Sequence, residues 1–232
     1  MPRRDGTVVR HSLSTKEPAD MHIDVFSDVV CPWCYLGKTR LEAALDRVAF
    51  GAEVDVRWRA FQLDPGASEQ PQDLRAEMER KYGSGAFDAM TQRLVTLGAA
   101  VGLDYRFDRV VRITSLPALR LVAWVEQEVG PAAAHGLHDR LFRAYFTEGA
   151  NIAVADNLVA WAVEVGADEG AARTAVQGQA GADAVQADLD WARRAGISSV
   201  PSFVIDQAHL IPGAQEVDTM VTLLTQVHSR AA

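Results

Sequence analysis

Apolar and polar residues alternate in two short segments near the start of the chain. One runs from residue 21 to residue 27 and the other from residue 54 to residue 61. Alternation with a period of two is typical of strands with one buried face. Between the two segments, from residue 34 to residue 50, apolar residues recur at the spacing of a helix. Together they predict a βαβ unit with a right-handed crossover.

The middle of the chain, from about residue 71 to residue 187, carries only helical patterns. Gly and Pro residues separate these patterns, and no alternating segment interrupts them. A run of alanine at 132–134 also favours helix. The predicted helices cover residues 73–82, 86–101, 116–129, 132–146, 154–165 and 169–176.

The end of the chain returns to mixed structure. The pattern predicts a helix over 182–195, two strands over 201–205 and 209–211, a turn between them, and an amphipathic helix over 216–227. The order of elements is therefore βαβ, a helical stretch and αββα. This order predicts an α/β fold in which a helical insertion separates the second strand from the third.

The composition of the 232 residues is that of an ordinary soluble globular protein, with 48% hydrophobic and 23% charged residues. The length suffices for one large domain or two small ones. The formal net charge of −8 argues against nucleic acid or an anionic membrane surface as a partner. No apolar run approaches the ~20 residues of a membrane-spanning helix.

Residues 1–19 are predicted to form a disordered tail that precedes the domain. The tail begins with basic residues, Arg3 and Arg4, but no apolar stretch follows them. It therefore lacks the pattern of a secretory or twin-arginine signal. We expect a cytoplasmic protein.

The only two cysteines, Cys31 and Cys34, lie where the first predicted strand passes into the first predicted helix. In a reducing compartment such a pair is more often catalytic than structural, and a bridge closing so short a loop would stabilise little. The helix N-terminus favours a thiolate at Cys31, and Pro32 suits the first turn. Cys34, one turn later, is placed to attack a mixed disulfide. The alternative is a pair of inert buried cysteines.

Histidines offer a weaker case for chemistry. His135 and His138 share a face of one predicted helix, and His22 or His209 could join them in a metal site. Tetrahedral zinc takes four ligands in short paired spacings, whereas this histidine pair lies about a hundred residues from the cysteines. We expect exposed helical histidines, no metal site and no cofactor.

Pro201 opens the third predicted strand, a position where a missing backbone donor is tolerated. Beside a dithiol we expect the Val200–Pro201 bond to be cis, although most such bonds are trans. Its geometry would offer the backbone N–H and C=O of Val200 to an extended thiol peptide. The alternative is an ordinary trans proline that begins a strand.

These segments together resemble the DsbA-like family of the thioredoxin superfamily, in particular its cytoplasmic FrnE-type branch. The resemblance runs from about residue 21 to the C-terminus, and the ordered set of motifs is more specific than the cysteine pair alone. The matching segments are 28–37 (DVVCPWCYLG), 58–65 (WRAFQLDP), 141–146 (LFRAYF), 151–152 (NI), 196–204 (GISSVPSFV) and 211–215 (IPGAQ).

The resemblance implies a thioredoxin-like domain of residues 20–66 and 183–232, with a helical domain of residues 67–182 inserted between its second and third strands. It implies that Cys31 is the attacking thiol and Cys34 the resolving thiol. Pro32, Trp33 and Pro201 would support the active site, the last as a cis-proline that faces the cysteines. Val200 and Trp33 would contact the substrate.

Three positions depart from the family pattern. The family often has Asn before Ser or Thr ahead of the first long insertion helix, where this chain has Thr114 and Ser115, and a histidine soon after, where it has Leu119. Strongly oxidising periplasmic relatives have His at the position of Trp33. Because Trp33 carries no charge and Asp28 is acidic, we expect a less stabilised thiolate at Cys31 than in those relatives.

The expected function is therefore thiol–disulfide exchange of the disulfide reductase or isomerase type. Expected partners are proteins with thiols or disulfides, with glutathione as a further option. A glutathione-dependent isomerase or transferase and a non-catalytic peptide-binding chaperone are the alternatives. The insertion, around Leu116–Leu119 and Phe142–Phe146, would either select substrates or pack its own core. The sequence leaves open the direction of exchange and the oligomeric state, for which a homodimer is one option.

Overall fold

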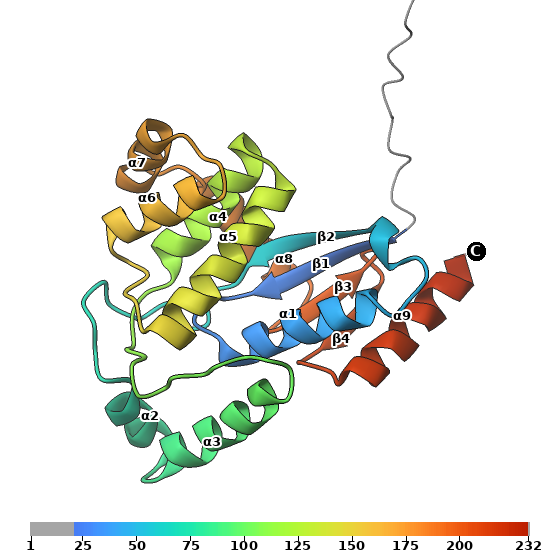
Figure 1. Cartoon of the computed structure of the whole chain (residues 1–232), viewed down its shortest axis with the longest axis horizontal. Helices are drawn as coiled ribbons and strands as arrows, with labels where there is room; N and C mark the ends of the chain where they lie inside the picture. Colours follow the sequence, from blue (N-terminus) through green and yellow to red (C-terminus); the bar gives the residue numbers. More distant parts are fainter. Residues whose placement is uncertain (1–20, 232) are drawn as a thin grey trace, which may run out of the picture.

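The computed structural model describes residues 21–231, so the predicted tail of residues 1–19 lies outside the described residues. A four-stranded mixed sheet in the order β2-β1-β3-β4 forms the centre of the molecule (Figure 1). The strands β1 and β2 are parallel, whereas β1–β3 and β3–β4 are antiparallel. The bounds are β1 Met21–Ser27, β2 Val54–Ala60, β3 Ser202–Ile205 and β4 His209–Pro212.

Helices cover both faces of the sheet. The helices α1 (Pro32–Leu45) and α9 (Val217–Ala231) pack on one face (Figure 1), and α8 (Ala182–Arg194) lies on the other. The alternation of β1 explains this arrangement: Ile23 and Val25 join the core under α1 and α9, whereas Phe26 packs against Trp191 of α8. A sheet buried on both faces in this way is the predicted α/β architecture.

The segment between β2 and β3 is helical, as the sequence predicted. Four helices, α4 to α7, gather beside β2, while the pair α2 and α3 lies apart from them near the start of α1 (Figure 1). A large apolar cluster, which includes Leu141, Phe142 and Phe146, fills the space between α4, α5 and α6. The bounds are α2 Leu74–Tyr82, α3 Ala86–Ala99, α4 Leu116–Glu128, α5 Pro131–Arg143, α6 Ala155–Glu164 and α7 Glu169–Gln177.

Several element ends differ from the predicted ones. The helix α1 ends at Leu45 rather than near residue 50, because the chain folds back over its last turn: a Cβ at Gly51 would lie 1.9 Å from the carbonyl oxygen of Leu45. A 3-10 turn, Gly51–Glu53, then leads into β2. The helix α5 ends at Arg143, and the residues predicted to continue it form a π-helical turn, Ala144–Glu148.

One expectation about exposure is wrong. His138 was expected on an exposed helix face, but only 2% of it is accessible, and its ring stacks on Trp58 of β2 at 4.3 Å between centroids. His135, one turn earlier, is half-buried and accepts a hydrogen bond from the indole nitrogen of Trp58 at 3.1 Å. The histidine face of α5 is therefore the face that docks the insertion on the sheet.

Candidate active site

The cysteine pair lies at the junction of β1 and α1. Cys31 is the N-cap of α1, and Pro32 occupies the first turn, which contains no acidic residue. The backbone N–H of Cys31 donates to the carbonyl of Asp28 at 3.0 Å, which fixes the turn between strand and helix. Both cysteines are free, with exposed fractions of 3% for Cys31 and 1% for Cys34. The unpaired N–H groups and the dipole of α1 act on these thiols.

Residues distant in sequence complete the dithiol site. The Cys31 thiol donates to the carbonyl oxygen of Val200 at 3.7 Å, and the Val200–Pro201 peptide bond is cis. Pro201 packs against α1 at Gly37, where an added Cβ would lie 2.8 Å from the proline Cγ. The fold therefore brings Cys31, Val200 and Pro201 together.

Pro32 and Trp33, between the cysteines, are held by the insertion. The hydroxyl of Tyr105 donates to the carbonyl of Pro32 at 2.6 Å. The half-buried ring of Trp33 has the guanidinium of Arg93, on α3, 5.5 Å from its centroid. Trp33 itself carries no charge, but Arg93 brings a positive charge next to the motif. No local pattern marked Tyr105 or Arg93, because both lie on the insertion, far from the cysteines in sequence.

Cys34 sits in a strongly desolvated environment. Burial raises the pKa of the Cys34 thiol well above its ordinary value, and the neighbouring Cys31 raises it further. The backbone of Asp28 and the hydroxyl of Ser27 act in the opposite direction on the pKa of Cys34. The Ser27 oxygen is itself buried, and within the described residues no group apart from the Cys34 thiol bonds to it. Cys34 is therefore held as a neutral thiol in the resting dithiol state.

Asp28 is a buried carboxyl group beneath the cysteine turn. Burial raises its pKa to about 6, although it accepts backbone hydrogen bonds from Leu63 at 2.7 Å and from Val30 at 3.3 Å. The side chain of Ser115, the N-cap of α4, also bonds to it. Through these contacts Asp28 ties the turn after β1 to the segment after β2 and to the start of α4. Leu63, one of its partners, and Leu116, which follows Ser115 in the chain, have exposed side chains.

One group of side chains has the composition of a metal site. Ligand atoms of Glu42, His135 and Asp139 lie within 4.8 Å of one another. The ammonium of Lys38, however, forms ion pairs with both Glu42 and Asp139, and His135 Nε2 lies 2.7 Å from Glu42. A buried cation already balances these carboxylates, so the group is an ion-pair network that joins α1 to α5.

The comparison with known protein families decides the assignment. The family model described as DSBA-like thioredoxin domain matches residues 22–225, which is nearly the whole described chain. The chain belongs to this family. The assignment agrees with the α/β architecture, the helical insertion and the position of the cysteine pair at the start of α1.

Relatives of this DSBA-like chain show how far the similarity extends. Uncharacterized protein YwbO of Bacillus subtilis (strain 168) is 30% identical over 201 residues, which cover 85% of this chain and 92% of YwbO. The crystal structure of a probable DsbA oxidoreductase from Streptomyces coelicolor is 31% identical, with a TM-score of 0.84 and 90% coverage of both chains.

A third similarity concerns the fold alone. The cytosolic disulfide reductase DsbM from Pseudomonas aeruginosa is 22% identical, with a TM-score of 0.65 and coverage of 90% of this chain and 99% of DsbM. DsbM has also been solved with GSH. The thioredoxin-like fold predicted from the sequence motifs is thereby confirmed, with oxidoreductases among the similar structures.

Proposed function

We propose that this protein catalyses thiol–disulfide exchange through Cys31 and Cys34. The observation that carries the proposal is the pair of free thiols one helical turn apart at the N-terminus of α1, with Cys31 against the carbonyl of Val200. Of the two thiols, Cys31 is the helix N-cap and Cys34 is the more deeply buried. Cys31 is therefore the attacking group and Cys34 the resolving group.

The proposed reaction balances in two steps. The Cys31 thiolate attacks one sulfur of a substrate disulfide, which forms a mixed disulfide and releases the first substrate thiolate. Cys34 loses its proton and attacks the Cys31 sulfur, which releases the second thiolate and leaves a Cys31–Cys34 disulfide. Two electrons pass from the enzyme to the substrate. A thiol reductant such as glutathione returns the dithiol, and isomerisation uses the first step followed by its reversal.

Proteins with disulfides are the proposed substrates. Val200 lies beside Cys31, and its backbone would pair with an extended peptide on either side of the target cysteine, in the manner of an added strand. Trp33 and Pro201 would form the walls of this position. Leu63, which is 47% exposed, and Leu116 present apolar side chains near the same site, and these favour an unfolded polypeptide over a small polar thiol.

Reduction of insulin disulfides with dithiothreitol as the reductant tests the proposal. The wild-type protein should accelerate precipitation of the insulin B chain, and Cys31→Ser should return the rate to that of dithiothreitol alone. Cys34→Ser should capture substrate through Cys31 without resolving it, so that mixed disulfides accumulate on non-reducing gels. Undiminished turnover by the Cys31→Ser protein would refute the assignment.

The same variants separate the alternative functions. A peptide-binding chaperone would keep its affinity for unfolded protein in both variants and show no turnover in the wild type. A glutathione-dependent isomerase or transferase would act on its substrate with glutathione and retain that activity in Cys34→Ser. The redox equilibrium of the wild-type protein with glutathione would then give the direction of exchange.

The cytoplasmic location stays a prediction, and the direction of exchange bears on it. In the described residues no helix is long and apolar enough to cross a membrane.

A further inference from the structure

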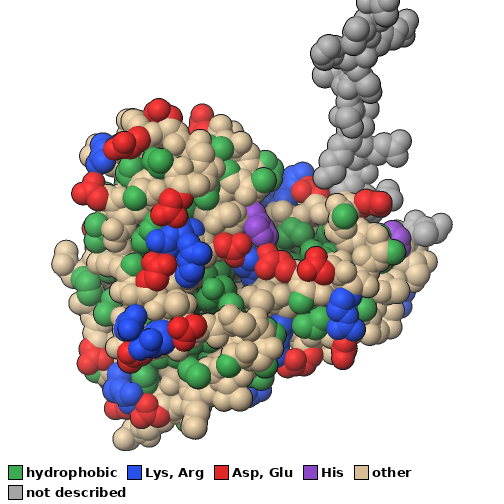
Figure 2. Space-filling model, in the orientation of Figure 1, with side chains coloured by type: hydrophobic (Ala, Val, Ile, Leu, Met, Phe, Trp, Pro, Cys, Tyr) green, Lys and Arg blue, Asp and Glu red, His purple; other side chains and the backbone are tan. Residues whose placement is uncertain are grey.

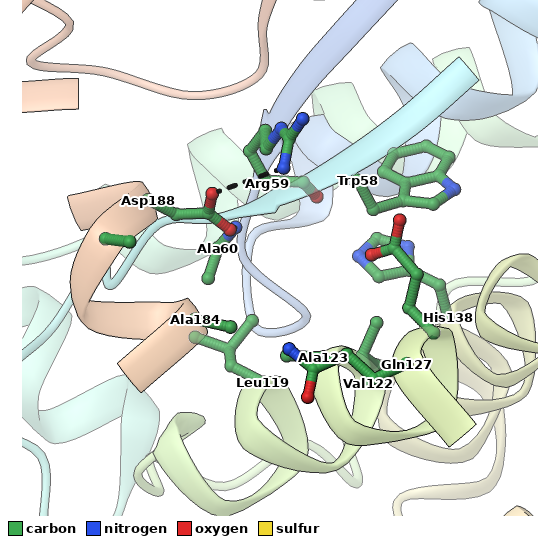
Figure 3. Close-up of a pocket in the computed structure, with 13 residues that line it drawn as sticks. Trp58, Arg59, Ala60, Leu119, Val122, Ala123, Gln127, His138, Ala184 and Asp188 are labelled. Atoms are coloured by element: carbon green, nitrogen blue, oxygen red, sulfur yellow. Dashed lines mark hydrogen bonds and ion pairs between the residues drawn. The ribbon is translucent and has the colours of Figure 1, made fainter. Parts of the chain in front are cut away.

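A concave site lies at β2, the edge strand of the sheet, where the sheet meets the insertion. Its volume is about 340 Å³, which is sufficient for a small organic ligand. Neither cysteine lines it. Figure 3 shows its walls, formed by β2, α4, α5 and α8. The lining residues include four alanines and two larger apolar side chains: Ala60, Ala123, Ala184, Ala187, Leu119 and Val122.

Two buried polar side chains in the wall of this cavity have hydrogen-bonding capacity that the protein does not use. Ser27 is 1% and His138 is 2% exposed, and both line the cavity. In the described residues His138 Nδ1 forms no hydrogen bond, and Ser27 Oγ has no partner apart from the Cys34 thiol. Burial places the pKa of His138 well below its ordinary value, so its ring is neutral. Since buried polar atoms are nearly always hydrogen-bonded, these atoms are suited to bind a polar group that enters the cavity.

Acidic groups define another part of the cavity. Asp188 accepts a hydrogen bond from the backbone of Ala60 at 2.9 Å, and Glu126 lies on α4. Burial raises the pKa of Glu126 and raises that of Asp188 to about 6. Arg59 is the basic residue of the lining, but it is paired with Asp24 at 2.7 Å and lies 3.6 Å from Asp188.

The charged groups that face the two acids leave a negative balance. The charges of Arg59, Glu126 and Asp24 act on the pKa of Asp188. The charges of Arg59, Arg57, Asp55 and Asp24 act on the pKa of Glu126. Around the two acids, two guanidinium groups therefore stand against four carboxylates; Lys38, the buried cation that acts on His138, is itself paired with Glu42 and Asp139. A cation is favoured in this cavity, and an anion is not.

We propose that this cavity binds a small aliphatic amine that carries a hydrogen-bonding group at its other end, such as an amino alcohol. The ammonium would lie between Glu126 and Asp188. The methylene chain would contact the alanine wall, and the distal hydroxyl would pair with Ser27 and His138. Neither cysteine lines the site, and the proposal does not rest on disulfide exchange; Ser27, which lies beside the Cys34 thiol, is the residue that the two sites share.

Isothermal titration of the full chain with 5-amino-1-pentanol at pH 7.5 and low salt tests the proposal. Two probes of similar size are the controls: 1,5-pentanediol lacks the charge, and 5-hydroxypentanoate reverses it. The amine should bind at least tenfold more tightly than the diol, and the carboxylate should not bind. Lowering the pH from 7.5 to 5.5 should weaken amine binding, because Asp188 takes up a proton near pH 6.

Variants locate the binding. Asp188→Asn and Glu126→Gln should each weaken amine binding about tenfold, and Ala123→Leu should abolish it by filling the cavity. Glu128→Gln, on the same helix but outside the lining, is the matched control and should bind like the wild type. Circular dichroism shows whether each variant is folded. Absence of amine binding, tighter binding of the carboxylate, or unchanged binding by Ala123→Leu would overturn the proposal. Unaltered amine binding in Cys31→Ser would separate this site from the redox site.

Discussion

At the scale of single residues, Ser27 places a hydroxyl next to a thiol that must ionise in a desolvated site. Burial opposes ionisation of Cys34, and Ser27 lowers the pKa of that thiol by hydrogen bonding. Because the Ser27 oxygen has no other hydrogen bond in the described part of the chain, it is available to the Cys34 thiolate when that forms. Hydrogen bonds to a charged group are stronger than those between neutral groups.

We therefore expect Ser27→Ala to slow the resolving step. With an aromatic disulfide reagent such as Ellman's reagent, release of the first aryl thiolate reports attack by Cys31, and release of the second reports attack by Cys34. The variant should keep the first rate and lose about 10-fold in the second, the equivalent of ~1.4 kcal/mol, with its pH profile shifted to higher pH. Thr39→Ala removes a hydroxyl that bonds to Tyr35 on the same helix and should change neither rate. Equal rates for both steps in Ser27→Ala and wild type would contradict this role.

Asp28 gives stability a predictable dependence on pH. Its pKa in the folded protein is about 6, above the ordinary value of 3.8. Between these two values the folded protein binds a proton that the unfolded chain does not, so stability increases as the pH falls. Relative to Asp28→Asn, the wild type should gain free energy of unfolding between pH 6.5 and pH 4, at up to about 1.4 kcal/mol per pH unit. Urea denaturation of both proteins across this range measures the difference. A difference that stays flat or falls on acidification would show that the carboxyl is not desolvated.

Only part of this residue-level picture could be predicted from the sequence. Cys31, Cys34 and Pro201 stand in short motifs whose residue types suggest their chemistry. Arg93 and Tyr105 reach the site through tertiary packing, and no spacing in the sequence indicates that they converge there; Ser27 is close in sequence, but no motif marks its hydroxyl. The same applies to His138, whose burial depends on its contact with Trp58 in β2.

At the scale of elements, α1 can approach the Pro201 segment only because one position on it has no side chain. A Cβ at Gly37 would lie 2.8 Å from Pro201 Cγ and 3.4 Å from the ring of Phe203. A larger residue there must push the Pro201 segment away from the helix that carries both cysteines. Overpacking of a core in this manner costs about 1–3 kcal/mol.

We expect Gly37→Val to lose about 1–3 kcal/mol of unfolding free energy and most of the disulfide reductase activity. Gly136→Ala on α5 is the matched control, because its Cβ would meet only Val165 at the ordinary distance of 3.4 Å. Since alanine is the better helix former, that variant should gain up to about 1 kcal/mol. Urea denaturation and the insulin assay measure both effects. A Gly37→Val protein with wild-type stability and activity would show that this contact does not position Pro201.

Element types could be predicted from periodicity, whereas element ends often could not. Strands and helices in this chain carry clear periods of two and 3.6, which report the buried face of each element. The end of α1 depends instead on the close approach of Gly51 to Leu45, and the end of α5 on a π-helical turn at Ala144–Glu148. Both are consequences of packing between segments and leave no periodic signal.

At the scale of the whole molecule, two sets of contacts join the insertion to the sheet half. Tyr105 and Arg93 contact the cysteine turn, as does Ser115 through Asp28. In the second set, Trp58 of β2 and Lys38 of α1 contact α5. Figure 2 shows acidic and basic side chains interspersed over the visible face, without a large patch of either sign. The sequence predicted the insertion, but these contacts depend on residues far apart along the chain.

Lys38 is the charged residue at the centre of the second contact. It is 3% exposed and pairs with Glu42 of its own helix and Asp139 of α5, which are 37% and 45% exposed. Loss of one partner from a buried pair costs about 3–5 kcal/mol. Because these carboxylates retain access to water, we expect Lys38→Met to lower the free energy of unfolding by about 1–3 kcal/mol. Amide hydrogen exchange should accelerate in both α1 and α5. Lys81→Met, which removes an exposed lysine from α2, should stay within about 0.5 kcal/mol of the wild type.

A double-mutant cycle separates the link between the two halves from the packing of the lysine stem. If Lys38 joins α1 to α5 through charge, Lys38→Met and Asp139→Asn should be non-additive, with a coupling of about 0.5–3 kcal/mol. The coupling should shrink in high salt, because one partner faces solvent. Strict additivity, with amide hydrogen exchange accelerated in α1 alone, would mean that the aliphatic stem of Lys38 stabilises only its own helix. Trp58 and the contacts at the cysteine turn would then hold the insertion in place without the charge of Lys38.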